Sequence, residues 1–375
     1  MNILKKMTIN LRGTIDNISK LYHEKKLVIK YNEKTMEVNI GGYINEYTVI
    51  KLIGRGEYGY VYQAQDRITM EMVAIKIFRN DSSHLYKHSA GIENYFLKLL
   101  KNNPYVVKII KPLDYQDHRM IVFEYLSHNL YNAIKITDGL PMKIVCNIGY
   151  QLVNFLNTMI PHNIIHRDLK PENILLVENN GMIKNQIKVI DFGLAAKQSN
   201  QMKHYIQSRY YRAPEVILEL PYNHMIDMWS VGCILAELFT TIPIFPGKDS
   251  IDQLHRIVSI MGDIPQEMLD GSKREFKNSE LKYEKISLDE IFNVDACGED
   301  KAEEKKQVDT FVDLLKQMLQ IDPKLRITSE KASYHPFFQL FPKPDNTNKR
   351  KHDDNSNDEQ PTKSFNKFER VSFHL

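Results

Sequence analysis

The 375-residue sequence predicts an α+β protein of two lobes, a small, mostly antiparallel β lobe with one main helix and a larger, mainly α-helical lobe. Between residues 47 and 126, five β-rich runs follow one another closely, and only one helix-like stretch, HSAGIENYFLKLLKNN, interrupts them. After Leu126, apolar residues recur at helical spacing in several long segments, beginning with MKIVCNIGYQLVNFLNTMI. This change of periodicity predicts the border between the lobes.

We predict one large domain over residues 47–338, preceded by an N-terminal extension, residues 1–46, in which LVIKY and MEVNI alternate like short strands. The domain has three predicted parts: a small lobe (47–123), a hinge (124–127) and a large lobe (128–338). Residues 263–306 are charged and weakly periodic, which predicts a surface insertion in the large lobe. Residues 339–375 are rich in Asn, Asp, Lys and Pro, which predicts a disordered tail.

The composition is that of a soluble globular protein, with 42% hydrophobic and 26% charged residues. A net charge of only +3 gives no reason to expect nucleic-acid binding. Three widely spaced cysteines, Cys146, Cys233 and Cys297, fit a reducing compartment, and no apolar run is long enough to span a bilayer. We therefore expect an intracellular monomer of the cytoplasm or nucleus, without membrane attachment.

A glycine-rich motif, GRGEYG, joins two β-rich runs and contains Gly54, Gly56 and Gly59. In a dinucleotide-binding fold the same pattern leads into a helix, whereas here it leads into a β-branched and aromatic segment. A strand–loop–strand cover over nucleotide phosphates is therefore favoured, with glycine allowing close approach of the backbone to the phosphates. A simple hairpin turn is the alternative for this motif taken alone.

The VAIK motif places Lys76 among apolar β residues, where a lysine is unusual unless it is paired. Glu93 lies in the helix predicted to follow. We predict a Lys76–Glu93 ion pair that holds the lysine against the α- and β-phosphates of ATP. The alternative is two unrelated surface charges.

The strongest signals are the long motif HRDLKPENILL and, after it in the chain, DFG. Asp168 is placed to accept the proton of a substrate hydroxyl, a role that contributes about 10²–10⁴-fold to rate. Lys170 can neutralise a phosphoryl group during its transfer. Asn173 and Asp191 offer the hard oxygen ligands that Mg²⁺ prefers.

Three further residues are interpreted as structural. RAPEVIL closes the segment that begins at DFG, and we expect its Glu215 to pair with Arg326 of DPKLRIT. Asp227 of IDMWSVG is expected to accept hydrogen bonds from the backbone of the HRDLKPEN loop.

Together these motifs resemble those of the eukaryotic protein kinase superfamily over roughly residues 47–338. The resemblance implies a bilobal fold that binds ATP and Mg²⁺ and transfers phosphate to protein hydroxyl groups. It implies that the backbone of Glu124 and Leu126 holds adenine and that Phe123 narrows the pocket behind it. The side chains implied to sandwich the adenine ring are Ala74, Val61 and Leu175.

Within the superfamily, SRYYRAPEVIL and the long insertion look like the CMGC group. YIQSRYYRAPE and LSHNLYNAIK are similar to the dual-specificity tyrosine-regulated (DYRK) kinases, Yak-type enzymes included. This likeness implies phosphorylation of Ser or Thr followed by Pro on protein substrates, and autophosphorylation of Tyr205. Arg209 and Arg212 would bind a phosphate there, and Arg167, which DYRK enzymes commonly lack, would add a contact to a phosphorylated loop.

Some features leave alternatives open. RAPE in place of RSPE is closer to the homeodomain-interacting kinases, so another CMGC Ser/Thr kinase remains an alternative. A catalytically silent scaffold is a second, although Lys76, Asp168, Asn173 and Asp191 are all in place. A small-molecule kinase would not need the segment from Tyr205 to Glu215. A preference for an upstream arginine would require acidic groove residues that the sequence does not place.

Overall fold

The computed structural model describes residues 26–31, 36–56, 58–79, 84–137, 139–179, 182–199, 206–279, 282–292 and 302–341. The predicted phosphosite Tyr205 lies outside these residues, as do Cys297 and the tail from residue 342 onward. The other two cysteines, Cys146 and Cys233, are buried thiols.

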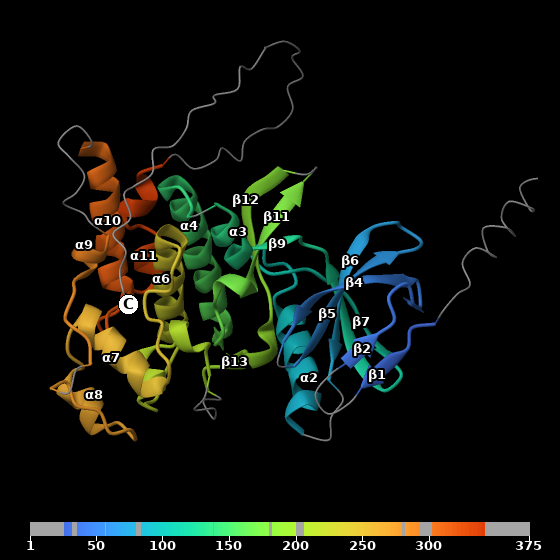
Figure 1. Ribbon diagram of the computed structural model, residues 1–375, viewed down its shortest axis with the longest axis horizontal. Helices are drawn as coiled ribbons and strands as arrows, with labels where there is room; N and C mark the ends of the chain where they lie inside the picture. The colour runs from blue at the N-terminus through green and yellow to red at the C-terminus, as the bar shows by residue number, and fades with distance from the viewer. Residues whose placement is uncertain are drawn as a thin grey trace, which may run out of the picture. The chain divides into compact units, whose positions relative to one another are not determined.

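The small lobe is a six-stranded antiparallel sheet with helix α2 packed against it (Figure 1). In spatial order the strands are β3 (Tyr43–Ile44), β4 (Tyr47–Arg55), β5 (Gly59–Asp66), β6 (Met72–Phe78), β8 (His118–Glu124) and β7 (Ile109–Tyr115). Helix α2 spans His84–Leu99. Five of the six strands correspond to the five β-rich runs of the sequence, so the predicted architecture of this lobe is confirmed.

The N-terminal extension contributes to the same lobe. It supplies the sixth strand, β3, and a hairpin of β1 (Ile29–Tyr31) and β2 (Met36–Val38), the two short strands expected from the alternation. Leu27 and Ile44 are fully buried in the core of the sheet, and the Tyr115 hydroxyl donates to the Leu27 carbonyl at 3.0 Å. The described residues 27–31 and 36–44 are therefore packed on the small lobe, a point that the sequence left undecided.

Helices build the large lobe. The long helices are α3 (Leu130–Thr137), α4 (Met142–Met159), α6 (Met225–Thr240), α7 (Ser250–Met261) and α10 (Ala302–Met318). The short helices are α5 (Pro214–Ile217), α8 (Gln266–Asp270), α9 (Leu288–Ile291) and α11 (Ser329–Ala332). Helix α6 is apolar on all sides and is buried from Met225 to Leu238, because α4 and α10 pack around it.

The predicted insertion is more regular than its sequence suggests. Helices α8 and α9 both lie within residues 263–306, and α10 begins inside this range, at Ala302. Short amphipathic turns of this length leave too weak a periodicity to be recognised in a charged sequence.

Short strands between the lobes position the motif loops. Strand β11 (Ile174–Asn179) pairs with β12 (Met182–Val189) on one side and with β9 (His128–Asn129) on the other. Strand β10 (Ile164–Ile165) pairs with β13 (Ala196–Lys197). The HRDLKPEN loop therefore follows β10 and leads into β11, while DFG directly follows β12.

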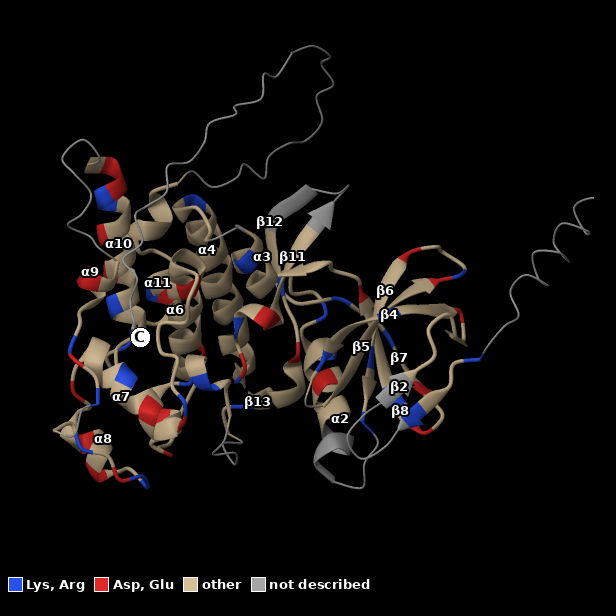
Figure 2. Ribbon diagram, in the orientation of Figure 1, with Lys and Arg blue, Asp and Glu red and all other residues tan. Residues whose placement is uncertain are grey.

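Acidic and basic residues are interspersed over both lobes, as Figure 2 shows for the described residues. Among the described helices, none has both the length and the apolar content that crossing a membrane would require.

Candidate active site

A buried lysine links the small lobe to the DFG motif. Lys76 lies in the middle of β6, between Val61 of β5 and Ile121 of β8. Its Nζ atom is 2.7 Å from Glu93 Oε2 on α2 and 2.9 Å from Asp191 Oδ1. The ion pair predicted between Lys76 and Glu93 is present, and its alternative, two unrelated surface charges, is wrong.

The charges of this cluster shift one another's pKa, and burial together with the Asp191 carboxylate raises the pKa of Glu93 to about 7, against the effect of Lys76. Burial alone would lower the pKa of Lys76, but the carboxylates of Asp191 and Glu93 outweigh it and raise the pKa above its usual value. Burial likewise acts to raise the pKa of Asp191, and the Lys76 ammonium overcomes this and holds it below the usual value. Lys76 is therefore a permanent cation, and Asp191 a permanent anion, at neutral pH.

Asp227, at the start of α6, holds the HRDLKPEN loop through hydrogen bonds to its backbone. The Asp227 carboxylate accepts hydrogen bonds from the backbone N–H groups of His166, at 2.6 Å, and Arg167, at 3.0 Å. Arg167 has a left-handed backbone with φ of 68°, a strained conformation that these bonds help to hold.

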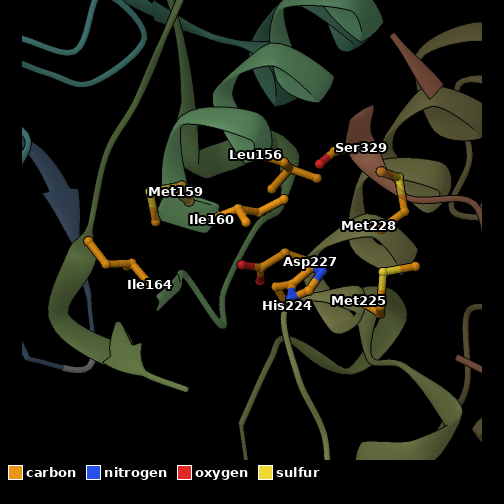
Figure 3. Close-up of a pocket in the computed structure, with 9 residues that line it drawn as sticks. All are labelled: Leu156, Met159, Ile160, Ile164, His224, Met225, Asp227, Met228 and Ser329. Carbon is orange, nitrogen blue, oxygen red and sulfur yellow. The ribbon is translucent and has the colours of Figure 1, made fainter. Parts of the chain in front are cut away.

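Asp227 also borders a cavity of about 10 Å³, lined largely by apolar side chains (Figure 3). Figure 3 shows Leu156, Ile160 and Met228 around Asp227 and its neighbour His224. This burial raises the pKa of the Asp227 carboxyl, against the opposing effect of its hydrogen bonds. The cavity is too small to hold a substrate or nucleotide, so we assign it no part in the chemistry.

Four groups surround the carboxylate of Asp168. Its Oδ1 atom accepts from both the backbone N–H of Ser208, at 3.0 Å, and the Ser208 hydroxyl, at 2.8 Å. Its Oδ2 atom is 3.0 Å from Lys170 Nζ and accepts from Asn173 Nδ2 at 3.2 Å. Lys170 also donates to the Ser208 hydroxyl at 2.9 Å, which closes a ring of three residues.

The two residues expected to bind a cation lie at neighbouring strand ends, Asn173 just before β11 and Asp191 just after β12. The backbone N–H of Ile190 donates to the Asn173 carbonyl at 3.0 Å, which brings Asp191 beside Asn173. Asn173 donates through Nδ2 to the Asp168 carbonyl at 2.8 Å, so its amide oxygen is the atom suited to a cation. An amide oxygen and a carboxylate form the hard donor set that Mg²⁺ prefers, so these residues fit that ion.

One glycine of the GRGEYG motif, Gly59, has a close contact within the sheet. A Cβ atom on Gly59 would lie 2.3 Å from the Ile77 carbonyl oxygen, so close strand pairing with β6 requires this glycine. Near Gly54 and Gly56 the closest atoms would be 3.5 and 3.7 Å away, which is ordinary contact. The sheet contact is one reason for a glycine at position 59, and the expected contact of the motif with phosphates stays a prediction. Strands β4 and β5 on either side of the motif pair antiparallel, in agreement with the predicted strand–loop–strand order.

The comparison with known families decides what kind of protein this is. Residues 47–338 match the protein kinase domain. The chain belongs to the protein kinase family. The likeness to kinases inferred from the motifs is therefore confirmed.

Two curated relatives are similar to the kinase over most of its length. The serine/threonine-protein kinase ppk15 of Schizosaccharomyces pombe is 35% identical over 335 residues, which cover 78% of this chain and 62% of the relative. The dual specificity tyrosine-phosphorylation-regulated kinase 2 of Drosophila melanogaster is 37% identical over 312 residues, covering 78% of this chain and 41% of the relative. The kinase thus matches less than two thirds of either relative's length.

The residues expected to contact adenine lie at the junction of the lobes. Phe123 of β8 and Ala74 of β6 are directly opposite in the sheet, and both are buried. Val61 packs against the same core. The backbone N–H of Glu124 donates to the Lys108 carbonyl at 3.1 Å, so the Glu124 carbonyl is its only backbone group suited to adenine. The remaining two, Leu126 of the hinge and Leu175 of β11, are half-buried.

The three arginines expected at a phosphate have other contacts in the kinase. Arg212 donates to the carbonyls of Ile206, at 2.8 Å, and Gln207, at 2.7 Å. Arg209 donates to carbonyls at the start of the segment that leads into α7. Arg167 donates to a carbonyl of the DFG segment and to a tyrosine hydroxyl. Because Tyr205 lies outside the described residues, its pairing with them stays a prediction.

The end of this segment is anchored in the large lobe. Arg326 donates to both carboxylate oxygens of Glu215, at 2.8 and 3.0 Å, and its guanidinium is fully buried. It donates to the Met225 carbonyl as well, at the N-terminus of α6. The pair expected from the sequence thus ties the segment to the helix that also carries Asp227.

A groove of about 510 Å³ contains the Asp168 partners Lys170 and Ser208, and both acidic and basic side chains line it. Glu237 of α6 is buried and accepts from the Tyr211 hydroxyl at 2.6 Å. Burial raises the pKa of Glu237 to about 7, and nearby Glu172 adds to this rise. Within the described residues, the Glu172 Oε2 atom is buried without a hydrogen-bond partner. The other groove residues are Tyr131, Ile134, Lys135, Lys170, Ser208, Arg209, Tyr210, Thr241 and Pro243.

Sequence reasoning missed Ser208 and Glu237. Ser208 lies inside the YIQSRYYRAPE motif, but a neutral hydroxyl gave no reason to place it on Asp168. Glu237 is one of the few polar residues in the largely apolar helix α6, and a buried carboxyl of that kind is a usable signal for a functional position.

Proposed function

We propose that this kinase uses ATP and Mg²⁺ to phosphorylate Ser and Thr residues that precede proline in protein substrates. The observation that carries the proposal is the meeting of two charged clusters, Lys76–Glu93–Asp191 and Asp168–Lys170–Asn173. They are joined by the backbone bond from Ile190 to Asn173. The first cluster suits a nucleotide and the second a substrate hydroxyl.

Each residue has a role that follows from its chemistry. Lys76 is a permanent cation fixed by Glu93, which suits the α- and β-phosphates of ATP. Asp168 accepts the proton of the attacking hydroxyl, and Lys170, 3.0 Å from it, offsets charge on the transferred phosphoryl group. Asn173 and Asp191 would hold Mg²⁺, which when bound supplies positive charge against the phosphates.

The groove supports a further preference in the peptide. Two carboxyl groups, Glu172 and Glu237, face one space, and one carboxylate oxygen has no partner within the described residues. A basic side chain upstream of the acceptor would satisfy both groups. These two carboxyl groups support a preference for an upstream arginine. We therefore propose an arginine on the N-terminal side of the phosphorylated residue.

We also propose that the kinase phosphorylates its own Tyr205 during maturation. The support is the likeness of YIQSRYYRAPE to the DYRK segment, together with the 37% identity to a dual specificity kinase. The described residues that follow, from Ile206, already contact the Asp168 loop through Gln207 and Ser208.

Synthetic peptides test the substrate preference directly. The chain contains no Ser-Pro or Thr-Pro dipeptide, so autophosphorylation cannot report a preference for proline. Three peptides would be compared: one with an upstream Arg and a following Pro, one with Pro replaced by Ala, and one with Arg replaced by norleucine. Each would be assayed with the wild type and Asp168→Asn, with and without Mg²⁺.

We expect Mg²⁺-dependent phosphorylation by the wild type only, fastest with the first peptide. Equal rates on the Pro and Ala peptides would overturn the proline preference but leave the kinase activity intact. Normal ATP binding without transfer to any peptide or protein would favour the scaffold alternative.

A further inference from the structure

Gln207 makes an unusual number of bonds for a loop residue. It lies just before the short helical turn Arg209–Tyr211 and is buried, with a left-handed backbone at φ of 62°. For a residue other than glycine this backbone is strained and persists only where the surroundings hold it. The described surroundings of Gln207 do so with bonds to three separate segments.

The backbone of Gln207 connects two parts of the site. Its N–H donates to the Arg167 carbonyl at 3.0 Å, which ties it to the HRDLKPEN loop. Its carbonyl accepts from Arg212 Nη2 at 2.7 Å. Gln207 is therefore fixed to the loop that carries Asp168 and to the far end of its own segment.

The side chain of Gln207 requires an amide. Its Oε1 atom accepts from the backbone N–H of Ala213 at 3.0 Å, and its Nε2 atom donates to the Ile226 carbonyl at 2.9 Å and to Ser230 Oγ at 2.8 Å. One end must accept and the other must donate, so the orientation of the amide is determined by its partners. A carboxylate or a thioether of similar size cannot satisfy both ends.

The next residue, Ser208, makes both of its donor bonds to Asp168 Oδ1. The position of Ser208 depends on where Gln207 is held, because the two are adjacent in a bent backbone. We propose that Gln207 is a positioning residue, which acts through Ser208 to orient the Asp168 carboxylate toward the substrate hydroxyl and to shape the peptide groove. This inference rests on the proposed kinase activity.

Two substitutions of similar size test the proposal. Gln207→Met removes both hydrogen-bonding ends, and Gln207→Glu keeps the acceptor but removes the donor. We expect each to lower kcat for the peptide by roughly tenfold, the consequence of leaving buried polar groups unpaired. The dissociation constant for ATP should stay within about twofold, because Gln207 has no bond to the Lys76 cluster. A loss shared equally by ATP binding would indicate a merely structural role and overturn the proposal.

The chain offers a matched control. Gln116 also has a left-handed backbone, with φ of 48°, but is exposed in the turn between β7 and β8. Gln116→Met should leave both kcat and ATP binding unchanged. If Gln207→Met does not fold, Gln207→Gly keeps the left-handed backbone at low cost and removes the same amide.

A double-variant cycle shows whether Gln207 acts through Ser208. If it does, kcat of the double variant Gln207→Met with Ser208→Ala should be no more than about twofold below that of the less active single variant. Fully multiplicative losses would contradict that route.

Hydrogen exchange provides a readout that does not need activity. In Gln207→Met, amide exchange should accelerate across residues 206–213 and stay unchanged in the middle of α6. Unchanged exchange at residues 206–213 would overturn the inference even in an inactive protein. A wild type that phosphorylates no peptide would instead overturn the proposed function, so the two failures are distinguishable.

Discussion

The nucleotide side of the site and its peptide side are held together by different interactions. On the nucleotide side, Lys76, Glu93 and Asp191 form ion pairs, and the first two extend from a strand and a helix. On the peptide side, Gln207 and Ser208 belong to a loop and are held by hydrogen bonds, some to backbone groups and others to side chains such as Asp168. Ion pairs between side chains of regular elements organise one side, and the hydrogen bonds of a loop, several of them to charged groups, organise the other.

This difference has a consequence for how each side tolerates change. A buried ion pair broken by removal of one partner leaves an unpaired charge, so the nucleotide side should lose function abruptly. The peptide side distributes its positioning over several hydrogen bonds, each with a modest net contribution. We expect graded losses there, and changes of substrate preference before loss of all activity.

The largest effect is expected at the point where the two sides meet. Asp168→Asn removes the proton acceptor but keeps the size and one oxygen that can accept from Ser208. We expect kcat to fall by about 10²–10⁴-fold while the ATP dissociation constant stays the same. Steady-state kinetics and nucleotide titration of the same preparation measure both. A large loss of ATP affinity would mean that Asp168 belongs to the nucleotide side.

A stability measurement probes the anchor of the peptide-side segment. Arg326→Met breaks a fully buried pair with Glu215 and should lower the free energy of unfolding by about 3–5 kcal/mol. Lys324→Met is the matched control, because Lys324 pairs with Glu267 at the exposed surface. The denaturation midpoint of this variant should equal that of the wild type. Chemical denaturation monitors both variants. Equal stability of the two would show that the Glu215 pair does not anchor the segment.

A conservative change isolates the nucleotide side. Lys76→Arg keeps the charge but presents a wide planar fork in a site where one compact ammonium contacts Glu93 and Asp191. We expect kcat/KM for ATP to fall by about 10–100-fold, the size expected for a lost charged hydrogen bond. The preference between Arg and norleucine peptides should stay the same. If that preference changed as well, the two sides would not be independent.

The smallest expected effect is the pH dependence of the preference for the Arg peptide. Burial and Glu172 raise the pKa of Glu237 to about 7, so Glu237 is largely neutral below pH 6 and charged above pH 8. A raised pKa means that the anion, and its attraction for arginine, appears as pH increases. The preference for the Arg peptide over the norleucine peptide should therefore rise by roughly threefold between pH 6 and 8.

Glu237→Gln provides the control for this pH dependence, since its amide oxygen can still accept from Tyr211. The preference should become independent of pH in this variant. A wild-type preference that is flat over the same range would remove Glu237 from substrate recognition.

The same division explains what could be predicted from the sequence. Lys76 and Glu93 were found because a charge among apolar strand residues demands a partner, and the pairing of Glu215 with Arg326 was expected from long motifs. Ser208, a neutral residue whose contact depends on how a loop folds back, was not found. The charges were visible in the sequence, whereas the backbone geometry that orders the peptide side was not.

A similar distinction applies to the fold, where local patterns predicted the main elements but not the features that depend on tertiary contacts. The five main strands and the long helices follow from periodicity over many residues. Strand β3 has only two residues, and the burial of Leu27 depends on contacts with β7, far away in the chain. Gly59 was singled out by its motif, but its close approach to the Ile77 carbonyl is a tertiary contact that no local pattern contains.

The most direct test of phosphate transfer by this site is phosphosite mapping by mass spectrometry. Wild type and Asp168→Asn would each be expressed in bacteria, where other eukaryotic kinases are missing. We predict phosphate on Tyr205 of the wild type and on no residue of Asp168→Asn. Phosphate on other residues of the wild type alone would retain the kinase and reject Tyr205 autophosphorylation. Identical phosphate patterns in the two proteins, or none in either, would contradict the assignment of Asp168 to a working site.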